Sequence, residues 1–374
     1  ERNDKDLTKD IFFQCNFEIH EKNNKPIFHE YNEKNLKYMD EEELSLHLLH
    51  RNFKSFAIGH GCSASWKVEN GKCIKVFTEI FPSHEIKPIK AKQFEELDLD
   101  MGKFSLDIKY SITQLRKLIH KYNDWLKNED TKSSTFDELL QEISKSNVNK
   151  AKEISKRIEE GIEILEKDKN AQEAFMFMNK AMLQQQFHYT LSTEEDFKFQ
   201  GKLKNINYAD EIKNIKIGDK IIKKGKWYPF QISFIIMNIK SFIDPLSKDR
   251  DIMDLIWFPT GGGKTEAYLG LSAFVIFLRK IINPNSYGNA VIMRYTLRLL
   301  TTQQFLRAST LICACEKIRS ENENKLGKLN IDIGLWIGGE ATPNKIENAN
   351  YLFDNLQTRF DLENKFLLIN CPWC

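Results

Sequence analysis

A glycine-rich loop between two apolar segments constrains this chain more than any other feature. Residues 254–258 predict a buried strand, and residues 265–280 predict a helix that is apolar on nearly every side. The loop between them contains Thr260, Gly261, Gly262, Gly263, Lys264 and Thr265. Glycines let backbone N–H groups approach an anion closely, and the N-terminus of the following helix adds a partial positive charge. We therefore expect this loop to bind the phosphates of a nucleotide.

Two side chains of the loop are the expected catalytic residues. Lys264 is expected to reach the β- and γ-phosphates of ATP, and the Thr265 hydroxyl to complete the coordination of Mg²⁺. The strict motif has a glycine six residues before the lysine, where this chain has Phe258. The alternative is a glycine-rich turn before an unrelated helix. The strand–loop–helix context favours the phosphate-binding interpretation, with ATP and Mg²⁺ as cofactors.

Strand-like and helix-like segments alternate around this loop. Besides the segments already named, strands are expected at 290–293, 331–337 and 366–369, and a helix at 301–319. Such alternation is typical of an α/β fold in which helices flank a parallel sheet. The sequence therefore predicts a RecA-like phosphate-loop lobe, with its parallel sheet and flanking helices, over residues 221–374.

Two regions precede this lobe. Residues 1–90 are predicted to be β-rich, because short apolar strands flank Asn70 and Gly71, a pair typical of a tight β-hairpin. Within this region, residues 41–49 predict a short helix. Residues 91–220 predict long amphipathic helices, since their apolar residues recur at helical spacing.

Candidate base- and DNA-binding residues lie on both sides of the loop. Phe230 and Gln231 precede it, and the glutamine amide can both donate to and accept from an adenine against which the aromatic ring packs. The alternative is a helix start with buried aromatic residues. Arg294, Thr296 and Arg298 follow the second expected strand and are expected to hold the phosphates of a single DNA strand. The alternative for these is a solvated loop and a surface helix.

Several of these strings resemble one family, the large superfamily 2 helicases of DISARM-type bacterial phage-defence systems. Residues 255–271 are similar to its motif I, residues 293–300 are similar to its motif Ia, and residues 56–62 look like a further family string. Phe230 with Gln231 resembles the Q motif of superfamily 2.

Gly338 and Gly339 resemble the elements that touch the nucleic-acid backbone, although a plain turn explains them as well. The resemblance implies an ATP-dependent DNA helicase or translocase. Its expected partners are single-stranded DNA, or DNA with a single-stranded overhang, and a companion defence subunit.

One departure from the family pattern qualifies this expectation. A superfamily 2 ATPase also needs an Asp-Glu motif for Mg²⁺ and the attacking water, and an arginine finger from a second lobe. Neither follows the loop in this chain. We therefore expect an incomplete lobe, truncated before the Asp-Glu motif, that binds ATP as the N-terminal portion of a larger protein and does not hydrolyse it efficiently alone.

Two other functions are compatible with the sequence. One is a non-catalytic module of a larger defence complex that binds DNA or a partner. The other is a phosphate-loop enzyme such as a small-molecule kinase, which the long helical region and the arginine-rich element after the second expected strand disfavour.

Cysteines suggest a second kind of site. Cys371 and Cys374 form a Cys-x-x-Cys pair, whereas structural Zn²⁺ usually takes two such pairs, so we expect a half-site completed by residues outside this chain. Cys313 and Cys315 are one residue apart on an expected helix and are interpreted as core residues. His60 and Cys62 lie in a glycine-flanked loop without an orienting acid, which favours a tight structural turn over a catalytic pair.

Composition limits the class of protein. The 374 residues carry a net charge of +2, which excludes a polycationic tail but not a local nucleic-acid groove. The longest apolar run, residues 267–278, is well short of the ~20 residues that a membrane-spanning helix needs. Seven cysteines at scattered spacings argue against a disulfide framework. We expect a cytoplasmic protein without a membrane partner.

Overall fold

The computed structural model describes residues 15–20, 27–31, 36–81, 94–193, 206–212, 216–217, 220–221, 224–258, 262–295, 298–337, 342–343, 345–355, 368 and 371–373. These residues divide into two compact units. Unit 1 takes its residues from Glu1–Pro88 and Trp125–Ala151, and unit 2 takes its residues from Ile89–Asp124 and Lys152–Cys374.

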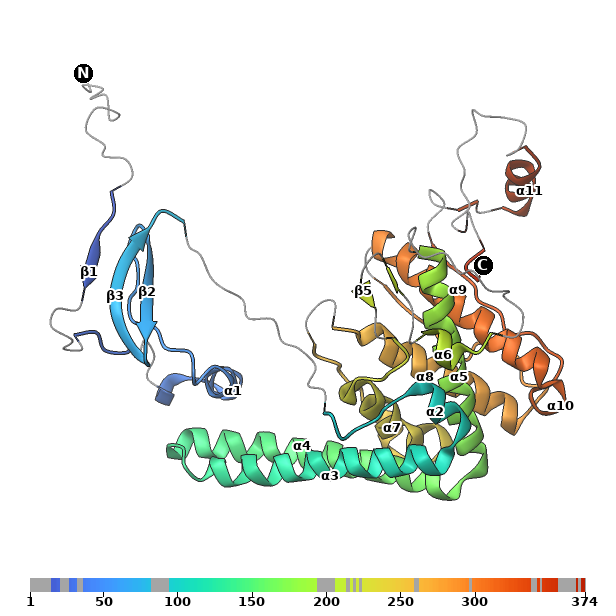
Figure 1. Cartoon of the computed structure of the whole chain (residues 1–374), viewed down its shortest axis with the longest axis horizontal. Coiled ribbons are helices and arrows are strands. Elements are labelled where there is room, and N and C mark those ends of the chain that lie inside the picture. The colour runs from blue at the N-terminus through green and yellow to red at the C-terminus, as the bar shows by residue number, and fades with distance from the viewer. Residues whose placement is uncertain are drawn as a thin grey trace. The chain divides into compact units, whose positions relative to one another are not determined.

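Unit 1 contains an antiparallel sheet. Its strands are β1 (Glu18–His20), β2 (Ser63–Glu69) and β3 (Lys72–Glu79), in the order β1-β3-β2 (Figure 1). The expected hairpin is confirmed, since Glu69 pairs with Lys72 across a turn in which both Asn70 (φ 49°) and Gly71 (φ 76°) have positive φ. Two successive residues with positive φ match the right-handed twist of the paired strands.

The expected helix at 41–49 is also confirmed, as α1 (Glu41–Leu49). Asp40 caps it, because its carboxylate accepts from the Glu43 N–H at 2.8 Å. The buried side chains of Leu44 and Leu48 form a small cluster with Leu140 on α4 (Glu138–Lys167). The 3-10 helix η1 (Leu36–Tyr38) precedes α1.

Long helices follow, as the sequence predicts. α3 (Ile108–Ser133) and α4 run side by side (Figure 1), and Arg116 on α3 donates two hydrogen bonds of 2.8 Å to Glu166 on α4. The helices that lie wholly within unit 2 are α2 (Met101–Leu106), α5 (Lys169–Thr193), α6 (Tyr208–Glu211), α7 (Pro229–Ile243), α8 (Lys264–Ile282), α9 (Arg298–Glu321), α10 (Glu323–Leu326), α11 (Ile346–Asn355) and the 3-10 helix η3 (Lys248–Asp251).

The core of unit 2 lies where α5 packs against α2, α8 and α9 (Figure 1). Phe274 and Phe277 of α8 are fully buried, and each contributes roughly 1.5–3 kcal/mol by leaving water. α8 also crosses α7 closely, because a Cβ atom at Gly270 would lie 2.7 Å from the Ile235 side chain. The prediction of a helix that is apolar on nearly every side is therefore confirmed.

The expected RecA-like parallel sheet is wrong for the described residues, whose fold is mostly helical. Apart from the sheet of unit 1, they show only β4 (Lys216–Ile217) paired antiparallel with β5 (Lys220–Ile221). The segments 254–258, 290–293 and 331–337 have irregular backbone, and the fourth expected strand lies almost wholly outside the described residues.

The error arose because an apolar segment forms a strand only if a neighbouring strand pairs with it, and apolar composition does not reveal such a partner. No backbone hydrogen bond joins these three segments to one another within the described part of the chain. Each segment also leaves large apolar side chains exposed, since Leu255 is 87% exposed, Ile292 83% and Trp336 99%, although Ile331 is buried. A short apolar run becomes a strand only where a neighbouring strand accepts its hydrogen bonds.

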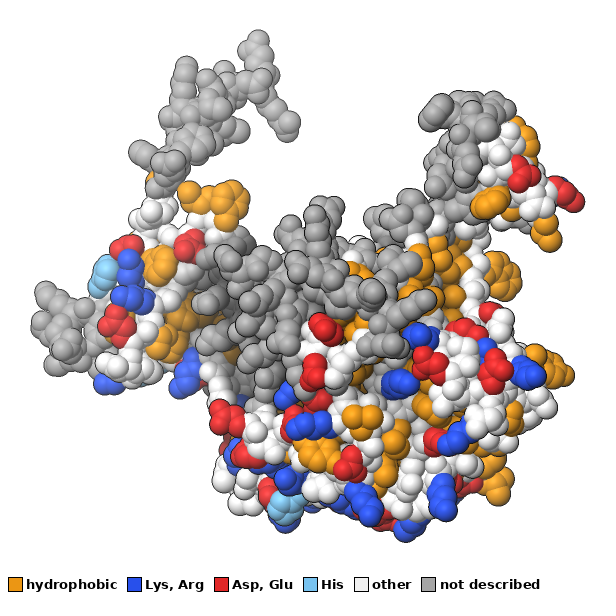
Figure 2. Space-filling model, turned by 45° about the vertical axis from the view of Figure 1, so that its right-hand side comes forward, with side chains coloured by type: hydrophobic (Ala, Val, Ile, Leu, Met, Phe, Trp, Pro, Cys, Tyr) orange, Lys and Arg blue, Asp and Glu red, His pale blue; other side chains and the backbone are white. Residues whose placement is uncertain are grey.

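The surface fits the near-neutral net charge. On the face drawn in Figure 2, basic and acidic side chains are interspersed rather than gathered by sign. None of the helices that the described residues form is long and apolar enough to span a bilayer.

Candidate functional site

The glycine loop meets α8 at Gly263, which has the left-handed backbone conformation (φ 87°, ψ 25°). A Cβ atom at this position would lie 2.7 Å from Nε2 of Gln231. Glycine is therefore required both by the backbone conformation and by the neighbouring side chain. Gly262, Lys264 and Thr265 are also described, whereas Thr260 and Gly261 lie outside the described residues.

The Lys264 side chain contacts the segment that precedes the glycines. Its Nζ donates to the backbone carbonyl of Phe258, the residue at which the strict motif would have glycine. The ammonium group is thus held beside the first turn of α8, whose leading N–H groups have no intrahelical partner. Contact between Lys264 and the phosphates of a nucleotide stays a prediction.

Gln231 connects the loop to the start of α7. It is 2% exposed, its Oε1 accepts from the Tyr228 N–H at 2.8 Å, and its Nε2 donates to the Gly263 carbonyl at 2.7 Å. In this structure both ends of the amide engage backbone groups. The helix start of the alternative interpretation is present, since α7 begins at Pro229, and contact with adenine stays a prediction.

Phe230 packs beside the loop rather than within the core. Its ring stacks on Phe258, with centroids 4.4 Å apart and planes 12° apart, and more loosely on Tyr228 at 6.2 Å. The chain before α7 is held by backbone bonds, because the Trp227 N–H donates to the Leu99 carbonyl at 2.9 Å. The aromatic–glutamine element therefore contacts both Phe258, which precedes the glycines, and Gly263, the last of them.

The first turn of α8 carries further polar contacts. The Thr265 hydroxyl lies 3.0 Å from the Tyr268 hydroxyl. Glu266 forms an ion pair with Arg307 of α9, and Arg307 in turn lies over the Tyr189 ring at 5.5 Å. Because Arg307 neutralises Glu266, the carboxylate repels an anion at the helix N-terminus less than an isolated carboxylate would.

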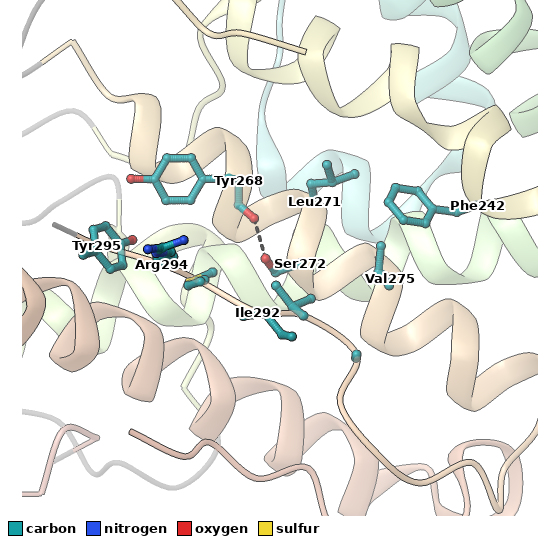
Figure 3. Close-up of a pocket in the computed structure, with 11 residues that line it drawn as sticks. Phe242, Tyr268, Leu271, Ser272, Val275, Ile292, Arg294 and Tyr295 are labelled. Atoms are coloured by element: carbon teal, nitrogen blue, oxygen red, sulfur yellow. Dashed lines mark hydrogen bonds between the residues drawn. The ribbon is translucent and has the colours of Figure 1, made fainter. Parts of the chain in front are cut away.

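A cavity of about 520 Å³ lies along α8 (Figure 3). Phe242 and Val275 lie at its apolar end, and Tyr268, Arg294 and Tyr295 lie at the opposite end. Burial and a hydrogen bond with Tyr268 raise the pKa of Tyr295, so this phenol stays neutral near pH 7.

The expected DNA-binding residues are only partly described. Arg294 is exposed and makes no ion pair with another described residue. Arg298 begins α9, but its side chain is not described. Thr296, Gly338 and Gly339 lie outside the described residues.

The Cys-x-x-Cys segment packs against the helices of unit 2. The Trp373 ring stacks on His188 of α5 at 3.5 Å between centroids, and the Thr310 hydroxyl of α9 donates to the Pro372 carbonyl at 3.2 Å. Cys371 is exposed, and its Sγ accepts from the Trp373 N–H at 3.4 Å. Cys374 lies outside the described residues, and the residues that are described contain no cluster of three metal-ligating side chains.

Two other interpretations of the sequence are confirmed. Cys315 is fully buried in the core, and burial raises the pKa of its thiol. Cys313 on the same helix is partly buried. His60 and Cys62 lie in a tight turn, where a Cβ atom at Gly59 would overlap the Cys62 carbonyl at 1.8 Å and Gly61 has φ 71°.

No known family model matches this chain. The chain is similar to DISARM protein DrmA of Bacillus paralicheniformis. The two are 32% identical over 392 aligned residues, which cover 98% of this chain and 33% of that protein. The chain thus spans about a third of its relative's length. The similarity confirms the resemblance to a DISARM protein and leaves the superfamily 2 motifs untested.

No pattern in the sequence indicated one polar cluster at the segment that leads into the loop. Arg157 on α4 donates to both carboxylate oxygens of Asp254, at 2.6 and 2.8 Å, over a separation of 97 residues. An arginine on an amphipathic helix ordinarily indicates a solvated face. Only the fold places it against the segment that leads into the loop.

Proposed function

We propose that this chain binds ATP at the glycine loop and belongs to an anti-phage defence protein of the DISARM type. The similarity to DISARM protein DrmA over 98% of the chain supports the role in defence. The geometry around Gly263 and Lys264 supports nucleotide binding. For the whole protein we propose ATP-driven movement along DNA, as a helicase or translocase that acts with a companion subunit.

One observation carries the nucleotide proposal. The Lys264 ammonium donates to the Phe258 carbonyl, and Lys264 is the first residue of a 19-residue helix that directly follows a glycine with positive φ. A lysine, a helix N-terminus and a backbone without Cβ atoms together make a site for a polyphosphate. The residues present therefore fit the phosphates of a nucleotide.

Each residue has a proposed role. Lys264 exchanges the Phe258 carbonyl for phosphate oxygens, and Thr265 offers its hydroxyl to Mg²⁺. Gln231 keeps the Gly263 carbonyl turned away from the phosphates by donating to it. ATP, when bound, supplies the phosphoanhydride bond whose hydrolysis drives the motor.

Two further sites belong to the proposal. Arg294 is an exposed cation at one end of the cavity in Figure 3 and is proposed to contact DNA phosphates. Cys371 and Cys374 are proposed as half of a structural Zn²⁺ site. The N–H of Trp373 donates to Sγ of Cys371, a bond that stabilises a thiolate and therefore fits a metal ligand.

The nucleotide site is tested with Lys264→Ala and a fluorescent ATP analogue in the presence of Mg²⁺. Loss of a charged hydrogen bond worth about 1.5–3 kcal/mol weakens binding roughly tenfold or more. Lys248→Ala is the matched control, because it removes an exposed lysine of the same unit outside the loop. Equal binding by Lys264→Ala and the unsubstituted protein would remove the nucleotide assignment.

The motor activity is tested by ATP turnover with and without single-stranded DNA. We expect DNA with a single-stranded overhang to stimulate turnover, and Arg294→Ala to reduce that stimulation while the affinity for the ATP analogue is unchanged. ATP binding without any stimulated turnover would favour the alternative, a non-catalytic module that binds DNA or a partner.

A further inference from the structure

The segment that leads into the glycine loop is held by side chains rather than by backbone pairing. No backbone–backbone hydrogen bond joins residues 253–258 to another described residue. In a β-sheet such bonds would set the spacing and register of the segment against its neighbour. Here the contacts of Asp254 and Phe258 take over that role.

The contact at Asp254 is a partly buried, bidentate ion pair. Arg157 donates from Nη1 and Nη2 to the two carboxylate oxygens, and the two side chains are only 12% and 15% exposed. The Nε of Arg157 also lies 3.6 Å from Oδ2 of Asp249, which precedes the segment. A planar guanidinium that meets a carboxylate through two parallel bonds fixes orientation as well as distance.

The helix that carries Arg157 is itself fixed against α7. A Cβ atom at Gly161 of α4 would lie 2.0 Å from the Ile236 carbonyl of α7, so the two backbones are in direct contact. Glu160, next to Gly161 on α4, also forms an ion pair with Lys240 on α7, with 2.8 Å between the carboxylate oxygen and Nζ. α7 is also the helix whose Gln231 donates to the Gly263 carbonyl. The two ends of the loop are therefore fastened to one pair of helices.

We propose that Arg157 is a positioning residue for the phosphate loop. It holds Asp254 at the start of the segment that ends at Phe258, the residue to which Lys264 donates, while Gln231 holds Gly263 at the other end. The proposal rests on the proposed function, because it deepens the description of the same nucleotide site.

Stability alone is a weak reason for such a pair. Desolvation offsets most of the attraction between buried charges, and replacing both partners by neutral residues of similar size is often close to neutral. Removing one partner is costly, because it leaves a buried charge uncompensated. Stability and loop position can therefore be separated by comparing single and double substitutions.

The experiment compares four forms with the unsubstituted protein: Arg157→Lys, Asp254→Asn, the double variant Arg157→Met with Asp254→Asn, and the control Arg116→Lys. Arg116 also forms a bidentate pair with a carboxylate on α4, but that pair makes no contact with the loop segment. Each form is measured for its denaturant midpoint, its affinity for the fluorescent ATP analogue, and its ¹⁹F resonance of 5-fluorotryptophan at Trp257. Trp257→Phe assigns that resonance.

We expect Arg157→Lys to weaken binding of the ATP analogue about tenfold. This is the loss expected if only roughly a tenth of the molecules have the loop in its binding-competent conformation. The Trp257 resonance is expected to broaden or split in this variant, and both readouts stay unchanged in Arg116→Lys. The double variant is expected to regain the denaturant midpoint lost by Asp254→Asn without regaining affinity or the sharp resonance.

Two results overturn the positioning role. One is a double variant that regains both the denaturant midpoint and the affinity for the ATP analogue, because the pair would then serve stability alone. The other is an unchanged resonance and affinity in Arg157→Lys. If Lys264→Ala leaves nucleotide binding unchanged, the proposed function fails by itself, and the Trp257 resonance still decides whether Arg157 positions the segment.

Discussion

Replacing Gly263 with alanine tests how the loop is fastened to α7. Gly263 and Gly288 have the same φ of 87°, but a Cβ atom at Gly288 meets nothing within 4 Å, whereas one at Gly263 lies 2.7 Å from Nε2 of Gln231. Gly288→Ala therefore isolates the backbone cost. Gly263→Ala adds the cost of displacing a buried amide.

The magnitudes follow from these two contributions. The left-handed conformation costs alanine roughly 1–2 kcal/mol, offset by about 0.4–1 kcal/mol from the reduced entropy of the unfolded chain. Displacing Gln231 breaks its 2.7 Å bond to the Gly263 carbonyl and leaves a buried donor, at about 1–3 kcal/mol. We expect Gly288→Ala to lower the unfolding free energy by about 1 kcal/mol and Gly263→Ala by about 2–4 kcal/mol.

The assay is urea unfolding at 25 °C followed by tryptophan fluorescence, with the m-value checked for each variant. In a Gln231→Ala background the two glycine substitutions should cost the same, because the displaced amide is no longer present. Equal costs at Gly263 and Gly288 in the unsubstituted background would refute the reasoning. So would an excess cost at Gly263 that persists without Gln231.

Three further predictions concern the core of unit 2. Burial lowers the pKa of His188 from 6.5 to about 4. Between pH 6.5 and pH 4 the unfolded chain therefore binds more protons than the folded protein. The unfolding free energy should fall by about 3 kcal/mol as the pH drops from 6.5 to 4. Unfolding of His188→Gln should lack that slope. Gly270→Ala should cost about 1–3 kcal/mol by overpacking, since its Cβ atom would lie 2.7 Å from two neighbouring side chains; a higher denaturant midpoint would contradict this. Arg319→Met should lower the unfolding free energy by about 3–5 kcal/mol, because it leaves the partly buried Glu316 without its bidentate partner. A loss below about 1 kcal/mol in calorimetry would contradict this prediction.

The sequence predicted those elements whose signals are local. The turn at Asn70 and Gly71, the helix α1 and the buried helix α8 all follow from spacing or turn chemistry within a few residues. The positions of the candidate residues at the helix starts follow in the same way, whereas their binding of a nucleotide stays a prediction. Lys264 and Thr265 begin α8 directly after the last glycine, and Phe230 and Gln231 contact the loop from the start of α7.

The prediction of strands was wrong because strand formation depends on residues far away in the sequence. Residues 254–258 and 331–337 have strand-like composition, but in the described residues neither has a partner strand. A strand is stable only when another strand hydrogen-bonds to it, and that strand often lies far away in the sequence. The apolar pattern of one segment does not show whether such a partner exists.

By itself, the sequence determined the glycines, the lysine and the helix that together suit a phosphate chain, because backbone freedom and helical periodicity are properties of neighbouring residues. Only the tertiary structure decided that Arg157 meets Asp254 across 97 residues and that Gln231 meets Gly263 across 32. These contacts depend on how α4 and α7 pack, and packing is set by the complementary shapes of side chains that are remote along the chain.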